Sequence, residues 1–206
     1  VRFLPMRTAA EIPPLGSQCR FLLAQPFLGD ASRALEERGA RRIAAPYPLG
    51  VEGTTAWLKA AADAFGVKPE RFDAVTAPGR ARAEQALSRH RAQLAGKSIF
   101  FFPDSQLEIP LARFLARELD MRPCEIGTPY LHRGLLSEEL KNLPSGVRIV
   151  EGNHRAYIAD FIRDARAGGC SAGKPPTYLG VRLVRETPSA KTLVARLRRL
   201  IGGGQT

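Results

Sequence analysis

Residues 97–133 constrain the fold most, because the hydrophobic periodicity changes twice within them. Residues 99–102 are wholly apolar and end at a proline, which predicts a strand buried on both faces. From Leu107 onward, apolar residues recur every three or four positions, which predicts a helix that tolerates Pro110 only in its first turn. Residues 124–126 predict a second strand. Strand, polar loop, helix and strand make a βαβ unit with parallel strands.

The same alternation continues along the rest of the chain. Further strands are predicted at residues 20–25, 41–45, 147–150 and 178–184. Further helices are predicted at residues 30–38, from Thr54 or Thr55 to 65, from Pro78 to 95, from Ser137 to 143, at 157–165 and at 187–201. Gly39 stands where the glycine after a helix belongs. The pattern predicts an α/β fold with a doubly wound parallel sheet.

The net charge of +11 is concentrated at the end of the sequence. Residues 151–206 hold 10 Lys and Arg against 4 Asp and Glu, which is +6. A basic protein can bind nucleic acid, in which case its affinity falls steeply with salt. Here the arginines are dispersed along predicted helices and no recognition motif accompanies them, so we expect no nucleic-acid partner. With no apolar run near the roughly 18 residues of a membrane span and no leader pattern, we expect a cytoplasmic location.

The residues that most often hold metals or nucleotides are present without their usual spacing. Cys19, Cys124 and Cys170 are far apart, which predicts buried or free thiols in a reducing compartment rather than a metal site. The three histidines are not at metal-ligand spacing. No glycine-rich nucleotide cradle and no Gly-x-Ser-x-Gly elbow occurs. The sequence therefore contains no complete catalytic constellation.

Polar residues collect in four loops that follow predicted strands. Ligands of such folds bind at the carboxyl ends of the strands, so these loops, residues 26–30, 46–55, 103–108 and 127–133, should meet at one sheet edge. They carry a mixed polar set: Glu52, Thr54, Thr55, Asp104, Ser105, Gln106, Tyr130 and His132. Other interpretations stay open. Thr54, Thr55 and Asp104 could cap helices and have no further role, while His132 and Glu52 could be solvated surface residues.

Several long segments resemble one family closely. They are QPFLGD at 25–30, EGTTAW at 52–57, FFFPDSQLEIPLARFL at 100–115 and TPYLHR at 128–133. They are similar to the N subunits of light-independent (dark-operative) protochlorophyllide reductases of the bacteriochlorophyll type, kin of the nitrogenase molybdenum–iron protein. The resemblance covers about residues 1–152 and implies a Rossmann-like, nitrogenase component 1-like middle domain there. Residues 153–206, which we cannot align with the family, are expected to form a separate basic α/β tail.

The resemblance also implies a function. The N and B subunits of this family form a heterotetramer that reduces the C17–C18 double bond of protochlorophyllide ring D. Electrons come from a separate ATP-binding iron–sulfur reductase component through a four-iron–four-sulfur cluster. This chain would be part of an oxidoreductase, inactive by itself. The alternative is a binding or assembly module that keeps the subunit interface without redox chemistry.

The family implies three cluster cysteines from the N subunit, in a domain that precedes the matched part. None of the three cysteines here falls on those positions, so we assign no metal ligand and expect no cluster on this chain alone. The loop after the strand at 99–102 lies beside the cofactor in nitrogenase kin. By that analogy Asp104, Ser105 and Gln106 would approach the pigment, with Thr54, Thr55 and His132 as further candidates.

Overall fold

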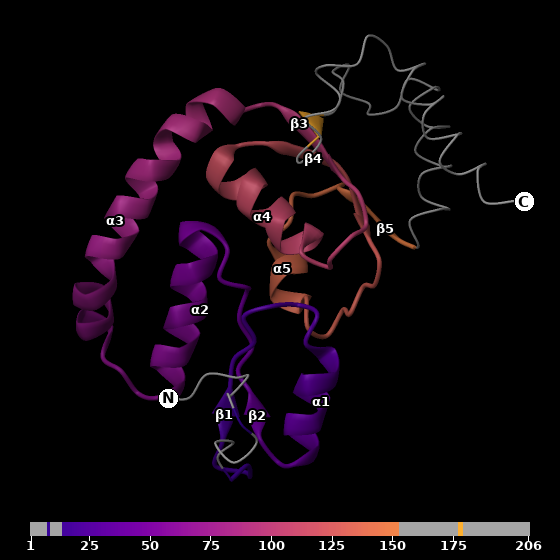
Figure 1. Cartoon of the computed structure of the whole chain (residues 1–206). Helices are drawn as coiled ribbons and strands as arrows, with labels where there is room; N and C mark the ends of the chain where they lie inside the picture. Colours follow the sequence, from indigo (N-terminus) through magenta and orange to yellow (C-terminus); the bar gives the residue numbers. More distant parts are fainter. Residues whose placement is uncertain (1–7, 9–13, 153–176, 179–206) are drawn as a thin grey trace, which may run out of the picture. The chain divides into compact units, whose positions relative to one another are not determined.

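The computed structural model describes residue 8, residues 14–152 and residues 177–178 (Figure 1). Parallel strands and helices alternate along these residues, which confirms the predicted α/β class. In chain order the elements are β1 (Arg20–Phe21), α1 (Gly29–Glu37), β2 (Arg41–Arg42), α2 (Gly50–Ala64), α3 (Pro69–Leu94), β3 (Ser98–Phe101), α4 (Glu108–Leu119), β4 (Arg122–Thr128), α5 (Ser137–Lys141), β5 (Arg148–Glu151) and β6 (Thr177–Tyr178).

The chain divides into two compact units. The first comprises Val1–Gln85 and His132–Lys141, and the second comprises Ala86–Leu131 and Asn142–Thr206. The first unit contains a two-stranded parallel sheet, in which Arg20 pairs with Arg41. Helices α1 and α2 lie on opposite sides of this sheet (Figure 1). Gly39, just past α1, has a φ of 90°, which a side-chain-bearing residue rarely adopts, so the predicted role of this glycine is confirmed.

A buried polar clamp joins two distant segments of the first unit. The backbone N–H of Tyr47 donates to the carboxylate of Glu139 at 2.6 Å, and the Tyr47 hydroxyl donates to the carbonyl of Leu135 at 3.1 Å. Tyr47 is 2% exposed and Glu139 is fully buried. Burial raises the pKa of Tyr47 to about 12, with nearby Arg42 acting to lower it and Glu139 to raise it.

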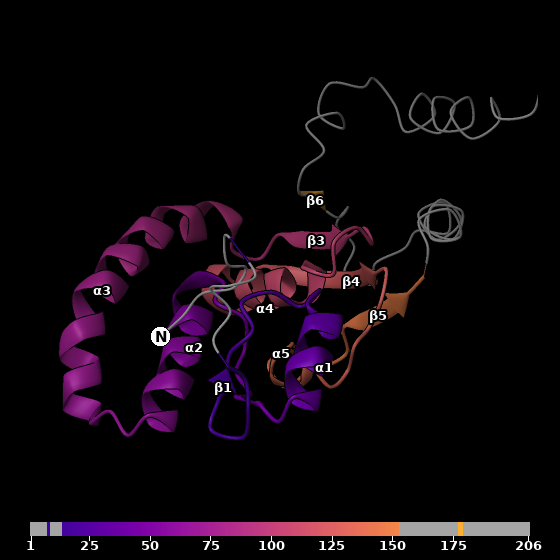
Figure 2. The same ribbon diagram turned by 60° about the horizontal axis from the view of Figure 1, so that its bottom comes forward.

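The second unit contains a four-stranded parallel sheet in the order β5-β4-β3-β6. Every residue of β3 is buried, as the continuous apolar run predicts. Helix α4 lies along the sheet beside β4 (Figure 2). The apolar core of this unit consists of Ile99, Phe100, Phe101, Ile109, Ala112, Leu115, Leu119, Met121 and Ile126.

The βαβ unit predicted from residues 97–133 is confirmed. Strands β3 and β4 are parallel and neighbouring, with α4 between them in the chain. Pro110 is the third residue of α4, so it lies in the first turn, where its missing N–H would have no intrahelical partner. The short helix predicted to begin at Ser137 and the strand predicted at residues 147–150 are found as α5 and β5.

Two predicted helix starts were wrong. Helix α2 begins at Gly50 after an extended Leu49, so Thr54 and Thr55 lie inside the helix and cap nothing. Helix α3 begins at Pro69 and continues through Pro78, which was predicted to open it. In both cases the local pattern assigns residues of low helical propensity to a loop. The structure includes them in the helix, because tertiary contacts outweigh propensity. Burial of Gly53 and Phe72 shows where those contacts lie.

The expectation of four loops at one sheet edge was also wrong. The described strands form two separate sheets, so two of the loops follow strands of the first unit and two follow strands of the second. Alternating patterns predict strands but carry no information on which strands pair. The helices predicted at residues 157–165 and 187–201, and most of the strand predicted at 178–184, lie outside the described residues.

Candidate functional site

The loop that follows β3 is the centre of the candidate site. Strand β3 ends at Phe101, and after Phe102 and Pro103 the next two residues, Asp104 and Ser105, are exposed. Gln106 has a φ of 68°, a left-handed conformation that is unfavourable for a residue with a side chain. The loop is therefore held in one specific shape, and it presents polar side chains at the carboxyl end of a parallel strand.

Glu108, the first residue of α4, holds this loop. Its Oε1 atom accepts hydrogen bonds from the backbone N–H groups of Asp104 and Ser105, at 2.7 Å each. The Ser105 hydroxyl in turn accepts the backbone N–H of Leu107 at 3.3 Å. A Ser followed three residues later by Glu is the capping-box spacing. That spacing was visible in the sequence and would have identified Glu108, which is not among the residues predicted for the site.

The neighbouring strand contributes a second part of the site. Because β4 runs parallel to β3, its carboxyl end at Thr128 lies at the same edge of the sheet. The Thr128 hydroxyl donates to the carbonyl of Tyr130 at 3.2 Å, and Tyr130 itself is 54% exposed. Strand β5 pairs in parallel with β4 and ends beside it, where the N–H of Gly152 donates to the Thr128 carbonyl.

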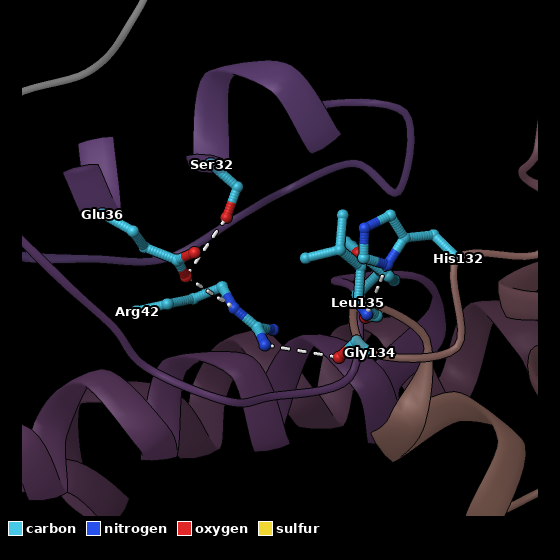
Figure 3. A network of polar contacts seen from close by, with 7 residues as sticks. Ser32, Glu36, Arg42, His132, Gly134 and Leu135 are labelled. Carbon is cyan, nitrogen blue, oxygen red and sulfur yellow. Dashed lines mark hydrogen bonds and ion pairs between the residues drawn. The ribbon is translucent and has the colours of Figure 1, made fainter. Parts of the chain in front are cut away.

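The other predicted site residues belong to the first unit. Thr54 and Thr55 are half-buried in the second turn of α2. His132 is half-buried, and its Nδ1 atom accepts the backbone N–H of Leu135 at 3.2 Å (Figure 3). The six predicted residues therefore fall three in each unit, with Asp104, Ser105 and Gln106 forming one continuous group.

Figure 3 shows what surrounds His132 in the first unit. The Arg42 guanidinium donates to the carbonyl of Gly134 at 3.3 Å and forms an ion pair with Glu36 at 3.4 Å. Glu36 also accepts from the Ser32 hydroxyl. Together these contacts tie the end of α1 and strand β2 to the turn that His132 begins.

Three of the alternative interpretations were wrong, namely that Asp104 caps a helix, that His132 is a plain surface histidine and that Glu52 lies in a loop. Helix α4 has Leu107 at its N-cap position, without a side-chain cap, so Asp104 does not cap it. His132 makes a turn-closing hydrogen bond rather than standing as a plain solvated histidine. Glu52 lies in the first turn of α2 and not in a loop.

The described residues do not fit a metal cluster. No group of three or more His, Cys, Asp or Glu side chains that could hold a metal ion occurs among them. Cys19 is a free thiol, as predicted, and its Sγ atom lies 3.5 Å from the carbonyl oxygen of Pro14. Cys124 is disulfide-bonded, so the same expectation was wrong there. The arrangement at the β3 and β4 ends can offer hydrogen bonds and an aromatic face to a ligand. None of the helices in the described ranges is both long and apolar enough to cross a membrane.

Comparison with known proteins places these observations in a family. The sequence profile described as "Nitrogenase component 1 type Oxidoreductase" matches residues 1–194, a range that extends past Gly152. A light-independent protochlorophyllide reductase subunit N from Rhodopseudomonas palustris (strain BisB5) is 62% identical over 166 residues, which cover 81% of this chain and 39% of that protein. The subunit N from Bradyrhizobium sp. (strain BTAi1 / ATCC BAA-1182) is 61% identical with the same coverage.

A solved structure supports the fold. The chain described as "Nitrogenase Cp1 at pH 6.5" matches with a TM-score of 0.50 at 19% identity, over 70% of this chain and 32% of that chain. The present chain spans about two fifths of the length of the curated relatives it matches. From the profile match, which covers nearly the whole sequence, it follows that this chain belongs to the nitrogenase component 1 type oxidoreductase family.

Proposed function

We propose that this chain is part of the catalytic component of light-independent protochlorophyllide reductase, in the position of the N subunit. The whole complex would reduce the C17–C18 double bond of protochlorophyllide ring D during bacteriochlorophyll biosynthesis. The observation that carries the proposal is the identity of 60–64% to several proteins of that name over four fifths of this chain. Such identity over 166 residues spans both strand-end loops of the second unit.

In this proposal the chain contributes to the pigment cavity. Asp104, Ser105 and Gln106 would line it, and Thr54, Thr55 and His132 are further candidates. Support comes from the exposed side chains of Asp104 and Ser105 at the carboxyl edge of β3 and from the exposed Tyr130 at the end of β4. These groups suit a planar aromatic molecule with oxygen atoms at its rim, because the Tyr130 ring can stack on the molecule and the polar side chains can form hydrogen bonds with its oxygen atoms.

The partners follow from the same proposal. They are the B subunit of the same reductase, the ATP-binding reductase component and protochlorophyllide, and all would meet in the cytoplasm, where ATP is available. The four-iron–four-sulfur cluster of the parent complex would be held outside the residues described here, because Cys19 and Cys124 fit no cluster. No step of the reaction is therefore assigned to a metal ligand of this chain.

The absence of a cluster site among the described residues favours a second function. A chain without cluster ligands could keep the subunit interface and act as a binding or assembly module. Both functions predict binding to the B subunit, and only the first predicts iron and turnover in the complex.

Co-expression tests the two functions. The full chain is purified with the B subunit, assayed for iron and acid-labile sulfide, and supplied with the ATP-binding reductase component, ATP and protochlorophyllide. Iron with turnover supports the reductase function. Association with the B subunit, with neither iron nor turnover, supports the assembly module. Failure to associate with the B subunit overturns both.

A separate experiment tests whether the matched segment of this chain can replace the corresponding segment of a subunit N. The matched 166 residues of the Rhodopseudomonas palustris subunit N are replaced by those of this chain. If the proposal is right, the hybrid protein supports protochlorophyllide reduction at a rate within about tenfold of the parent. An assembled hybrid that is inactive would contradict it.

A further inference from the structure

We infer that Glu108 is a positioning residue, which fixes the loop of Asp104, Ser105 and Gln106 in the shape that recognises the ligand. This inference rests on the proposed function and deepens it. It adds Glu108 to the site, although Glu108 is not one of the polar residues predicted at the strand ends. Glu108 is 4% exposed, so it does not itself meet a ligand at the surface. Its effect passes through the loop.

The contacts show how the loop is held. One carboxylate oxygen accepts two consecutive backbone N–H groups at 2.7 Å, so the peptide units of Asp104 and Ser105 are both fixed. Hydrogen bonds to an ionised carboxylate are about twice as strong as neutral ones. The next residue, Gln106, has a left-handed conformation with a φ of 68°, so the fixed peptide units directly precede the unusual backbone of this loop. Without Glu108 the two hydrogen bonds that fix the residues just before this unfavourable conformation would be lost.

The second oxygen of Glu108 separates this arrangement from an ordinary helix cap. The Oε2 atom is buried and has no hydrogen-bond partner among the described residues. A buried acceptor without a donor is unfavourable, and a solvated glutamate could cap a helix without that cost. A buried polar atom without a partner calls for an explanation, and a local geometry that function requires is one such explanation.

The geometry points to a recognition surface made by the loop. The backbone N–H groups of Asp104 and Ser105 are used internally, whereas both residues are exposed. The Ser105 hydroxyl accepts from Leu107, which leaves its hydrogen able to donate. Ser105 and the Gln106 carboxamide can thus donate to peripheral oxygen atoms of the pigment, provided that the loop keeps its shape.

Three substitutions separate position from charge. Glu108→Gln keeps an oxygen that can accept both N–H groups, whereas Glu108→Ala removes it. Glu108→Asp keeps the charge but is one methylene shorter and withdraws from the loop. As a matched control, Leu119→Ala removes a buried side chain (4% exposed) from the other end of α4 without touching the loop.

Hydrogen exchange of the full chain gives the first readout, independent of any ligand. We expect the Asp104 and Ser105 amides to exchange at least about tenfold faster in the Ala and Asp variants, and within about threefold of wild type in Gln. Leu119→Ala should raise exchange across α4 in general, without singling out these two amides. Equal loop protection in all Glu108 variants would overturn the inference.

Protochlorophyllide binding by the complex of the full chain and the B subunit gives the second readout. We expect the dissociation constant to rise about tenfold or more in Glu108→Ala and Glu108→Asp, and little in Glu108→Gln or in Leu119→Ala. Unchanged affinity in all variants, with a loosened loop, overturns the inference and leaves the proposed function standing. If the wild-type complex binds no pigment at all, the proposed function fails, and the recognition role fails with it.

Discussion

The two sheets of the molecule are stabilised in different ways. In the second unit, β3 is buried along its whole length, and Ile99 of β3 and Ile126 of β4 are fully buried. In the first unit, neither strand has a buried residue, and the buried apolar side chains, Ala40, Ala62, Phe72, Leu135 and Leu136, all lie outside the two strands. There a buried tyrosine and a buried glutamate join segments about 90 positions apart.

This difference explains which sheet local sequence predicts well. An apolar core requires hydrophobic side chains at a regular period, and that period is visible in a short stretch of sequence. A polar clamp requires specific donors and acceptors from distant segments, and no local pattern records them. We therefore expect the second sheet to depend on side-chain volume and the first to depend on hydrogen-bond geometry.

The largest expected effect is in the second sheet. Ile99→Ala should lower the free energy of unfolding by about 2–5 kcal/mol, because it leaves a cavity in a strand with no exposed residue. Urea unfolding followed by circular dichroism measures this change. Ile149→Ala on the half-buried edge strand β5 is the control, and it should cost clearly less. Equal costs would show that β3 is not the centre of the core.

The clamp of the first unit should show the next largest effect. Glu139→Ala should cost about 1.5–3 kcal/mol, because the buried N–H of Tyr47 then loses its charged acceptor. Glu139→Gln keeps an acceptor oxygen and should recover part of this loss. If both variants unfold at the wild-type urea concentration, the clamp does not stabilise the first unit and the contrast between the sheets fails.

A smaller effect is expected for the Tyr47 hydroxyl. Tyr47→Phe removes the bond to the Leu135 carbonyl and should cost about 1 kcal/mol at pH 7. The pKa of Tyr47 is about 12 in the folded chain against 10.0 without the fold, so the folded state holds its proton longer. This stabilisation is complete below pH 10 and is lost as the pH rises towards 12. The difference in stability between wild type and Tyr47→Phe should shrink over that interval, and a constant difference would refute the assignment.

The smallest effect should come from an exposed ion pair of the second unit. Arg91 donates to Asp120 at 2.6 Å, and this bond lowers the pKa of the Asp120 carboxyl. A lowered pKa stabilises the fold above the ordinary value of 3.8, and this contribution disappears as the pH falls through the folded value. Asp120→Asn keeps a residue that tolerates the φ of 53° there. This substitution should change the free energy of unfolding at pH 7 only slightly, and it should reduce the loss of stability at acid pH. High salt should weaken the ion pair of the wild-type chain and so reduce the difference between the two proteins.

Much of the candidate site could be predicted from sequence. Asp104, Ser105 and Gln106 follow an apolar strand directly, and the rule that ligands bind at strand ends indicated them. Glu108 was missed although its capping-box spacing was present. Its burial, and the lack of a partner for its second oxygen among the residues described, depend on packing around α4 and could not be predicted locally. Thr54 and Thr55 were assigned to a helix start because Gly50 and Gly53, which lie before them in α2, have low helical propensity and made the first turn look like a loop.

The sequence by itself determined the α/β class, the βαβ unit around α4, the glycine after α1 and the polar loop after β3. These features depend on periodicity and on the conformational preferences of single residues, which act within a few positions. Only the tertiary structure decided that the strands form two sheets, that Tyr47 meets Glu139 and that Glu108 is buried under its loop. Those features depend on which distant segments meet, and the free energy of such contacts exists only when the whole unit has folded.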